Sequence, residues 1–241
     1  HSKAGETAEA EELYKQILSK FPKNKKAING YNKLKAEITS KVSGNSDPPQ
    51  DEVQGLINLY NQGQFEKALE KAKPLISLFP KAKTLHNIYN IQGASDASLQ
   101  KYDAAIDSYK QAIKIKPDFA EAYNNMGIAL KDKGELDAAI DSYKQAIKIN
   151  PDFAEAYNNM GTSLQNAREL GAAIDNYKQA IKIKPDFAEA YNNMGTSLQN
   201  IGELDAAIDS HKQAIKIKPN YASAYNNIGI ALKDKGELDA A

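Results

Sequence analysis

One spacing constrains this chain more than any other feature, because four prolines stand 34 residues apart. They are Pro117, Pro151, Pro185 and Pro219. The segments between them are near copies, since residues 118–151 and 152–185 are identical at 25 of 34 positions. A proline inside a helix costs about 3 kcal/mol. The spacing therefore excludes one long continuous helix and predicts a stack of short, similar units.

The unit that spans residues 118–151 predicts two helices. The first is expected over residues 119–133, because its apolar side chains recur at intervals of three and four, as on one face of a helix. These side chains are Tyr123, Met126 and Leu130. We expect Asp118 to cap this helix, with Glu121 completing a capping box. We expect Gly134 to end the helix with a positive φ angle.

The second helix of the unit is expected over residues 136–149, and Pro151 follows it. Its buried stripe is Ala139, Tyr143, Ala146 and Ile147. Aspartates near its start and lysines near its end suit the helix dipole, so we interpret them as a solvated surface. In the next unit Arg168 stands at the position of Gly134 and Gly202, and we interpret Arg168 and Gly171 as a local rewiring of that turn.

The conserved spacing of large and small residues within each unit resembles that of the tetratricopeptide repeat (TPR) family. In the first full unit these residues are Tyr123, Met126, Gly127, Leu130, Ala139, Tyr143, Ala146 and Pro151. The resemblance implies an all-α fold, a right-handed α-solenoid of stacked antiparallel helix pairs. It also implies that the first helices line a concave face, where the ligands of such arrays usually bind.

The resemblance weakens toward the N-terminus, where we expect a loosely attached pair of helices. The expected division is partial repeat-like helices over 1–41, a linker over 42–50, a divergent repeat over 51–85, a repeat with a lengthened first helix, or a lengthened entry to it, over 86–119, full repeats over 120–153, 154–187 and 188–221, and a truncated repeat over 222–241. Because both ends fall inside a repeat, we expect the chain to be part of a longer protein.

Positions on the first helices opposite the apolar stripe form rows from one repeat to the next. The first row is Asn124, Asn158, Asn192 and Asn226, and the second row is Asn125, Asn159, Asn193 and Asn227. The remaining groove candidates are Thr162 and Thr196, in one row with Ile128 and Ile230; Lys131, Gln165, Gln199 and Lys233; and Asp132, Asn166, Asn200 and Asp234. We expect these rows to line the concave groove.

An asparagine amide offers one acceptor and two donors, which match the C=O and N–H of an extended peptide. The second row resembles the asparagine ladder with which O-linked N-acetylglucosaminyltransferases grip the main chain of a peptide. The alternative is that one row bonds the neighbouring helix and has an architectural role. A hydrogen bond contributes about 0.5–1.5 kcal/mol, against association costs of about 4–15 kcal/mol. With few aromatic side chains expected in the groove, the sequence predicts micromolar or weaker affinity.

Composition and motifs exclude several classes of function. Lys plus Arg and Asp plus Glu are both 31, so the net charge is zero, and no basic row follows the groove as nucleic-acid binding would require. The chain has no cysteine and only three histidines, and it lacks phosphate-loop, zinc-protease and nucleophile-elbow motifs. We therefore expect no catalytic residue, cofactor or metal site. His211 replaces the tyrosine of other repeats, and we interpret it as a packing residue.

The sequence favours a non-catalytic scaffold that binds a protein or peptide partner as an extended segment. No apolar run approaches the roughly 18–20 residues of a membrane helix, so we expect no membrane insertion and a cytoplasmic location by default. One alternative is the substrate-recognition arm of a larger glycosyltransferase or sulfotransferase. Another is a self-assembling scaffold, a head-to-tail homo-oligomer, because residues 1–117 carry net charge +5 and residues 118–241 carry −5.

Overall fold

The computed structural model describes residues 2–42 and 47–236, and it describes side chains over 10–34 and 47–236. This part of the chain consists of α-helices without a strand, which confirms the all-α class. The helices are α1 (Ser2–Lys20), α2 (Lys25–Val42), α3 (Gln50–Asn61), α4 (Phe65–Leu78), α5 (Leu85–Ser98), α6 (Tyr102–Ile115), α7 (Ala120–Lys133), α8 (Leu136–Ile149), α9 (Ala154–Asn166), α10 (Leu170–Ile183), α11 (Ala188–Asn200), α12 (Leu204–Ile217) and α13 (Ala222–Lys235). No described helix combines the length and the apolar character needed to cross a membrane.

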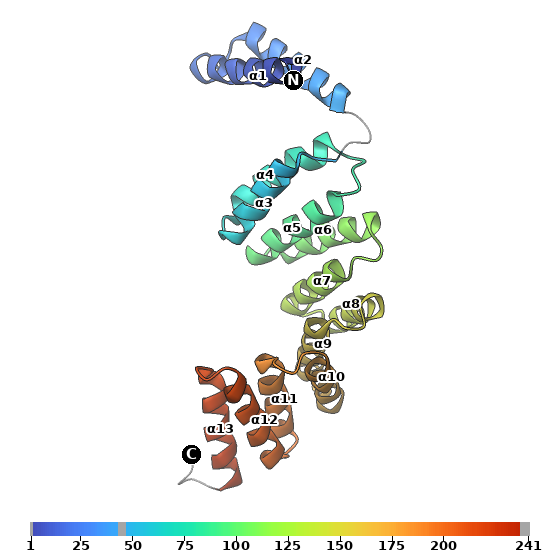
Figure 1. Cartoon of the computed structure of the whole chain (residues 1–241), viewed down its shortest axis with the longest axis vertical. Coiled ribbons are helices and arrows are strands. Elements are labelled where there is room, and N and C mark those ends of the chain that lie inside the picture. The colour runs from blue at the N-terminus through green and yellow to red at the C-terminus, as the bar shows by residue number, and fades with distance from the viewer. Residues whose placement is uncertain (1, 43–46, 237–241) are drawn as a thin grey trace.

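Antiparallel helix pairs follow one another along an elongated, curved array (Figure 1). Consecutive helices from α3 to α13 pack against each other, and first helices of neighbouring pairs, such as α7 and α9, also touch. At the N-terminal end α1 and α2 form a pair of their own, in which the rings of Tyr14 and Tyr31 lie 6.3 Å apart. The N-terminal helix pair that the sequence predicts is therefore present. Residues 43–46 of the expected linker lie outside the described residues, and α3 already begins at Gln50.

The predicted helix boundaries hold within one residue in the first full unit, but the predicted cap is wrong. Helix α8 spans Leu136–Ile149 as expected, and α7 starts at Ala120. The N-cap residue of α7 is Phe119, with no side-chain hydrogen bond, so Asp118 is not the cap. Phe119 is only 8% exposed, and burial of this ring between repeats fixes where the helix starts. Gly134 has a φ of 92°, as predicted.

The turn at Arg168 keeps the geometry of its neighbours, so the predicted rewiring is wrong. Arg168 adopts a φ of 64° itself. The Glu169 N–H donates to the Leu164 carbonyl at 2.8 Å, as the Glu135 N–H does to Leu130 at 2.9 Å. Gly171 lies within α10 and takes no part in the turn. A non-glycine residue in this left-handed region costs about 1–2 kcal/mol, which the packed helix pair sustains.

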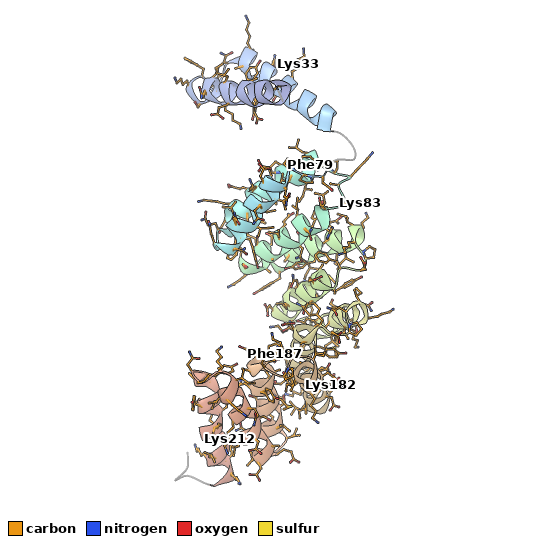
Figure 2. The ribbon with its side chains drawn as sticks, in the orientation of Figure 1. Lys33, Phe79, Lys83, Lys182, Phe187 and Lys212 are labelled. Carbon is orange, nitrogen blue, oxygen red and sulfur yellow. The ribbon has the colours of Figure 1, made fainter. Side chains whose placement is uncertain are left out.

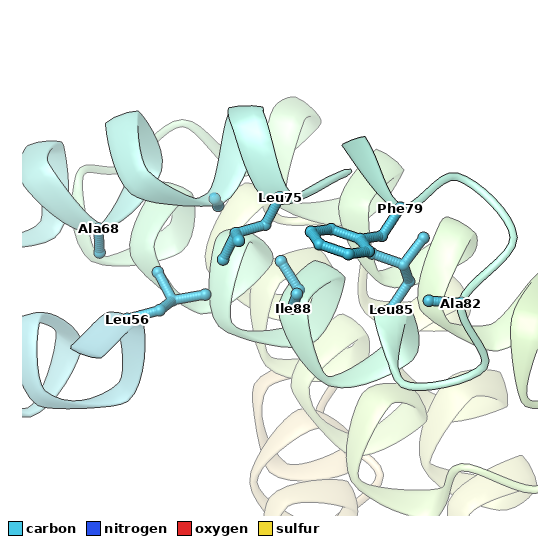
Figure 3. Close-up of a cluster of buried hydrophobic side chains, with 8 residues drawn as sticks. Leu56, Ala68, Leu75, Phe79, Ala82, Leu85 and Ile88 are labelled. Carbon is cyan, nitrogen blue, oxygen red and sulfur yellow. The ribbon is translucent and has the colours of Figure 1, made fainter. Parts of the chain in front are cut away.

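The extra residues before residue 119 lengthen mainly the entry to the first helix, one of the two predicted possibilities, and the helix itself is not lengthened. Helix α5 has 14 residues, the same number as α7. The extra residues lie in the connections on either side of it, chiefly the segment 79–84 that joins α4 to α5. Phe79 and Ala82 of this segment are buried in one apolar cluster with Leu56, Leu75 and Ile88 (Figure 3). The longer connection is therefore part of the core between α4 and α5.

In the four helix pairs from α5–α6 to α11–α12, an aromatic side chain packs directly on a glycine of the partner helix. Tyr143 and Tyr177 are fully buried on second helices. A Cβ atom placed on Gly127 would lie 2.6 Å from the Tyr143 ring, and one on Gly161 would lie 2.7 Å from the Tyr177 ring. Since no larger residue fits there, these glycines set how closely the two helices approach.

Aromatic residues also occupy the loops that join one helix pair to the next. Phe187 is 9% exposed and sits immediately before α11. The Nζ atom of Lys184 lies 4.7 Å from its ring centroid and 3.1 Å from Glu155 Oε1. In Figure 2 Phe79 and Phe187 lie in such loops, whereas Lys182 and Lys212 belong to exposed helix faces. A lysine also lies over the aromatic ring at two other junctions, Lys116 over Phe119 and Lys218 over Tyr221, so these three junctions combine packing of the ring with a cation above it.

Replacement of Gly161 by Ala tests the contact between glycine and aromatic ring. The added methyl group must displace the Tyr177 ring, so we expect a loss of about 1–3 kcal/mol in the free energy of unfolding. The matched control is Gly171→Ala, because that Cβ would meet nothing within 4 Å and should stabilise α10 by up to about 1 kcal/mol. Urea unfolding measures both. Equal effects of the two changes would contradict this account of the packing.

Candidate functional site

The two asparagine rows connect neighbouring repeats through their side chains. Each Nδ2 of the second row donates to the Oδ1 of an asparagine 35 residues earlier, in the first row. The bonds run from Asn125 to Asn90 (3.1 Å), from Asn159 to Asn124 (3.0 Å), from Asn193 to Asn158 (3.1 Å) and from Asn227 to Asn192 (3.1 Å). Asn90 on α5, which was not among the predicted groove residues, begins the first row. The equivalent residues therefore form an ordered line along the array.

Burial separates the two rows. In the first row Asn124, Asn158 and Asn192 are 6%, 9% and 8% exposed, so they belong to the packing between repeats. Asn226 is exposed, and no described helix follows α13 to cover it. The expectation that both rows face a ligand is therefore not supported for the buried members of the first row. Their contacts match the architectural alternative.

The second row keeps part of its surface and part of its bonding capacity. Asn125, Asn159 and Asn193 are half-buried. Each donates one N–H to the first row, while an asparagine amide carries two N–H groups and one carbonyl. The Oδ1 of Asn125 also accepts a long contact of 3.4 Å from Asn124. The bond to the preceding repeat restrains each amide, and each side chain keeps a second N–H beyond the one it donates to the first row.

The other groove candidates form a polar surface bonded within and between repeats. Their bonds are Thr162 Oγ1 to the Asn158 carbonyl (3.1 Å), Thr196 Oγ1 to the Asn192 carbonyl (3.1 Å), Tyr177 Oη to Gln165 Oε1 (2.9 Å), Ser197 Oγ to Gln165 Oε1 (3.2 Å), Gln199 Nε2 to Asp234 Oδ2 (2.7 Å) and Lys131 Nζ to Asp132 Oδ1 (2.7 Å). Lys233 is exposed. Most of these groups are already oriented by partners within the protein.

A pocket of about 290 Å³ opens next to Asn125, where α3, α5, α6 and α7 meet. It is lined by Tyr60, Ala94, Ala97, Ser98, Tyr109, Asn125, Ile128 and Asp132. The structure thus brings three groove candidates together with two tyrosines that the sequence analysis did not select. The prediction of a groove poor in aromatic side chains is wrong at this position. The sequence did contain a signal for this pocket. Helix α5 has alanine or serine at the three positions that are occupied by Ile128, Lys131 and Asp132 in the next repeat.

His211 is a packing residue, as predicted. It is fully buried, and its ring lies against Gly195 in the place that Tyr177 takes against Gly161. Its Nδ1 lies 3.1 Å from the Asn192 Oδ1, and its Nε2 is buried without a hydrogen-bond partner. Burial lowers the pKa of the His211 imidazole to about 4. Within the described residues no three His, Asp or Glu side chains gather as a metal site would require.

Replacement of Asn158 by Ala tests the structural role of the first row. The change removes the buried Asn158 side chain and leaves the half-buried Asn193 N–H without its acceptor, so we expect a loss of about 1–3 kcal/mol in the free energy of unfolding. Asn226→Ala removes the same side chain where it is exposed, and it should change stability by less than about 0.5 kcal/mol. Thermal and urea unfolding measure the difference. If both variants were as stable as the parent protein, the bonds between repeats would carry no stability.

The low pKa of His211 predicts an acid-sensitive repeat. The imidazole titrates near pH 6.5 when unfolded and near 4 when folded, so the folded state excludes the proton. Its contribution is complete above about pH 6.5 and is lost as the pH falls to about 4, by up to about 3 kcal/mol. His211→Tyr should remove this part of the acid sensitivity. Denaturant unfolding at a series of pH values measures it, and parallel pH curves for the two proteins would rule it out.

Family models and related proteins agree with this architecture. A model described as "TPR repeat" matches residues 93–134, 129–166, 169–202 and 200–236, and one described as "Tetratricopeptide repeat" matches residues 1–24. A curated relative is the probable UDP-N-acetylglucosamine–peptide N-acetylglucosaminyltransferase SEC of Arabidopsis thaliana, 40% identical over 76 residues. The match covers 32% of this chain and 8% of that protein.

Several solved structures share the fold. A crystal structure of MamA is 33% identical, with a TM-score of 0.57, over 61% of this chain and 86% of that one. YrrB, described as a TPR protein with an unusual peptide-binding site, is 19% identical with a TM-score of 0.60, over 78% and 96% of the two chains. TTC0263 of Thermus thermophilus is 20% identical with a TM-score of 0.60, over 76% and 98%. Because the repeat models cover more than half of its residues and the helix pairs have the matching packing, the chain belongs to the tetratricopeptide repeat family.

Proposed function

We propose that this protein is a protein-interaction scaffold whose concave groove binds extended peptide segments by their main chain. One observation carries the proposal: the second row of asparagines is half exposed, regularly repeated and held in a fixed orientation by the first row. A fixed amide binds with a smaller loss of side-chain freedom than a mobile one. The peptide-binding site in the description of YrrB supports a peptide as the class of ligand.

The chemistry of the second row suits a peptide main chain rather than a particular sequence. The free N–H of Asn159 would donate to a peptide C=O, and its Oδ1 would accept from a peptide N–H. Asn125 and Asn193 would repeat this contact one unit to either side. Each net hydrogen bond contributes only about 0.5–1.5 kcal/mol, so the row by itself supports micromolar or weaker binding with little dependence on sequence.

The test compares short Ser-Gly-Thr peptides with analogues in which alternate backbone nitrogens are methylated. N-methylation removes peptide N–H groups that would donate hydrogen bonds to the asparagine Oδ1 atoms. We therefore expect a loss of binding in isothermal titration calorimetry. Peptides of the same composition in scrambled order should bind alike. Equal affinity for methylated and unmethylated peptides would contradict main-chain gripping.

A triple variant tests the row itself. Replacement of Asn125, Asn159 and Asn193 by Ala should abolish binding of the unmethylated peptides. The matched control replaces three glutamines, exposed at equivalent positions on second helices, by Ala; they are Gln111, Gln145 and Gln179. Circular dichroism of both variants verifies folding. If the asparagine variant is folded and still binds, the groove residues are assigned wrongly.

A second candidate function is substrate recognition on behalf of a glycosyltransferase. It is favoured by the 40% identity to the Arabidopsis transferase, although the match covers only a small part of that protein. The residues that follow Ala241 in the native protein test it. A transferase domain there would support this function, and a native end near Ala241 would exclude it.

A further inference from the structure

The pocket beside Asn125 exists because small residues of α5 stand where the later repeats have larger ones. At the three groove-lining positions of α5 stand Ala94, Ala97 and Ser98, whereas α7 carries Ile128, Lys131 and Asp132 at the equivalent positions. Helices α9 and α11 likewise carry Thr, Gln and Asn there. The small side chains of α5 leave about 290 Å³ unfilled. In the repeats that follow, larger side chains stand at these positions.

Two tyrosines give this pocket rigid aromatic surface. Tyr109 is 2% exposed and is held against Gly93, where a Cβ atom would come within 2.7 Å of its ring. Tyr60, at the end of α3, lies 5.7 Å from the Phe65 ring. Burial, followed by the proximity of Tyr60 and Asp96, raises the pKa of the Tyr109 phenol. The Tyr109 hydroxyl therefore stays protonated and can both donate and accept.

Asp132 is the one charged residue among those lining this pocket. Its side chain is 39% exposed, and Lys131 Nζ lies 2.7 Å from its Oδ1. A carboxylate has about four acceptor sites on two oxygens, so this contact leaves capacity for a second donor. Ala94, Ala97 and Ile128 offer apolar surface beside it. The pocket thus combines a short apolar wall, aromatic faces and a carboxylate.

We propose that this pocket binds a basic side chain of the peptide, arginine in preference to lysine; the proposal rests on the function proposed above. The aliphatic stem would lie against Ala94 and Ala97. The guanidinium would lie over the ring of Tyr60 and donate to Asp132. A planar guanidinium stacks on aromatic rings and donates in several directions, which an ammonium group cannot match. Asn125 would hold the main chain of the same residue.

Other side chains suit the pocket less well. A glutamate would bring its charge toward Asp132. A large apolar side chain would cover that carboxylate and the Tyr109 hydroxyl without offering either a hydrogen-bond partner, which is unfavourable. This pocket would supply the anchor that main-chain contacts lack, and it would fix the register of an otherwise sequence-tolerant groove.

The test uses short acetylated Ser-Gly peptides that carry one Arg, citrulline, norleucine or Glu at the same position. Citrulline keeps the shape of arginine and removes its charge. We expect the Arg peptide to bind about tenfold more tightly than the citrulline and norleucine peptides, and the Glu peptide to bind most weakly. A preference for norleucine, or no preference, overturns the proposal.

Asp132→Asn should abolish the preference for Arg over citrulline. The change suits the fold, because Asn166 and Asn200 occupy the equivalent positions. The matched control is Asp234→Asn, in the same row but on α13 and outside the pocket. Loss of the preference in the control as well would place the arginine elsewhere and overturn the proposal.

Filling the pocket gives an independent variant. Ala94→Thr with Ala97→Gln installs the side chains found at the equivalent positions of α9, Thr162 and Gln165, and it should lower affinity for the Arg peptide about tenfold while the Ser-Gly peptide binds as before. An unchanged affinity for the Arg peptide would overturn the anchor.

The two proposals fail in different ways. If every peptide binds alike and the asparagine triple variant loses binding, the main-chain function stands and the anchor is wrong. If no peptide binds, N-acetylarginine methylamide is titrated alone, with the backbone amide signals of residues 94–98 and 125–132 followed by NMR. Shifts at these signals support the pocket without the groove, and their absence overturns both.

Discussion

The close contact between an aromatic ring and a glycine is the interaction on which the helix pairs from α5–α6 to α11–α12 depend. In each of these pairs the ring occupies the space that a Cβ atom on the glycine would need. The pairs are Tyr109 with Gly93, Tyr143 with Gly127, Tyr177 with Gly161 and His211 with Gly195. This contact fixes the distance between the helices of a pair. Because neighbouring pairs then stack with the same geometry, equivalent residues of successive repeats come to lie in rows. The asparagine bonds and the pocket both follow from that repetition.

The asparagine rows combine contacts between repeats with the surface that we propose for recognition. The first row is buried and accepts hydrogen bonds, while the second row donates to it and keeps one edge exposed. A buried amide is costly unless it is paired. The hydrogen bonds from the second row provide partners for the buried carbonyl groups of the first row. The same bonds orient the amides that we propose to hold a peptide. His211 enters this arrangement through Asn192, which couples the packing of one repeat to the bonding of the next.

Much of the fold could be predicted, because it depends on local patterns. The spacing of prolines and the apolar stripes placed α7 and α8 within one residue. Failures came where packing overrides local preference. Phe119 starts its helix through burial of its ring, although Asp118 is the better capping residue. Arg168 accepts a positive φ because the helices around it are fixed. The extra residues before α6 lie in the connections on either side of α5, whose length is unchanged. In the connection before α5, Phe79 and Ala82 are buried in an apolar cluster.

The sequence by itself determined the repeated helix pair, the glycine and aromatic positions that close it, and the two asparagine rows, since these depend on spacing along one chain. Only the tertiary structure decided which row is buried, because the covering side chains come from a repeat 35 residues away. It also decided where the pocket beside Asn125 lies. The pocket is formed by small residues on α5 and walls from α3, α6 and α7, and a space between four helices arises only when they pack.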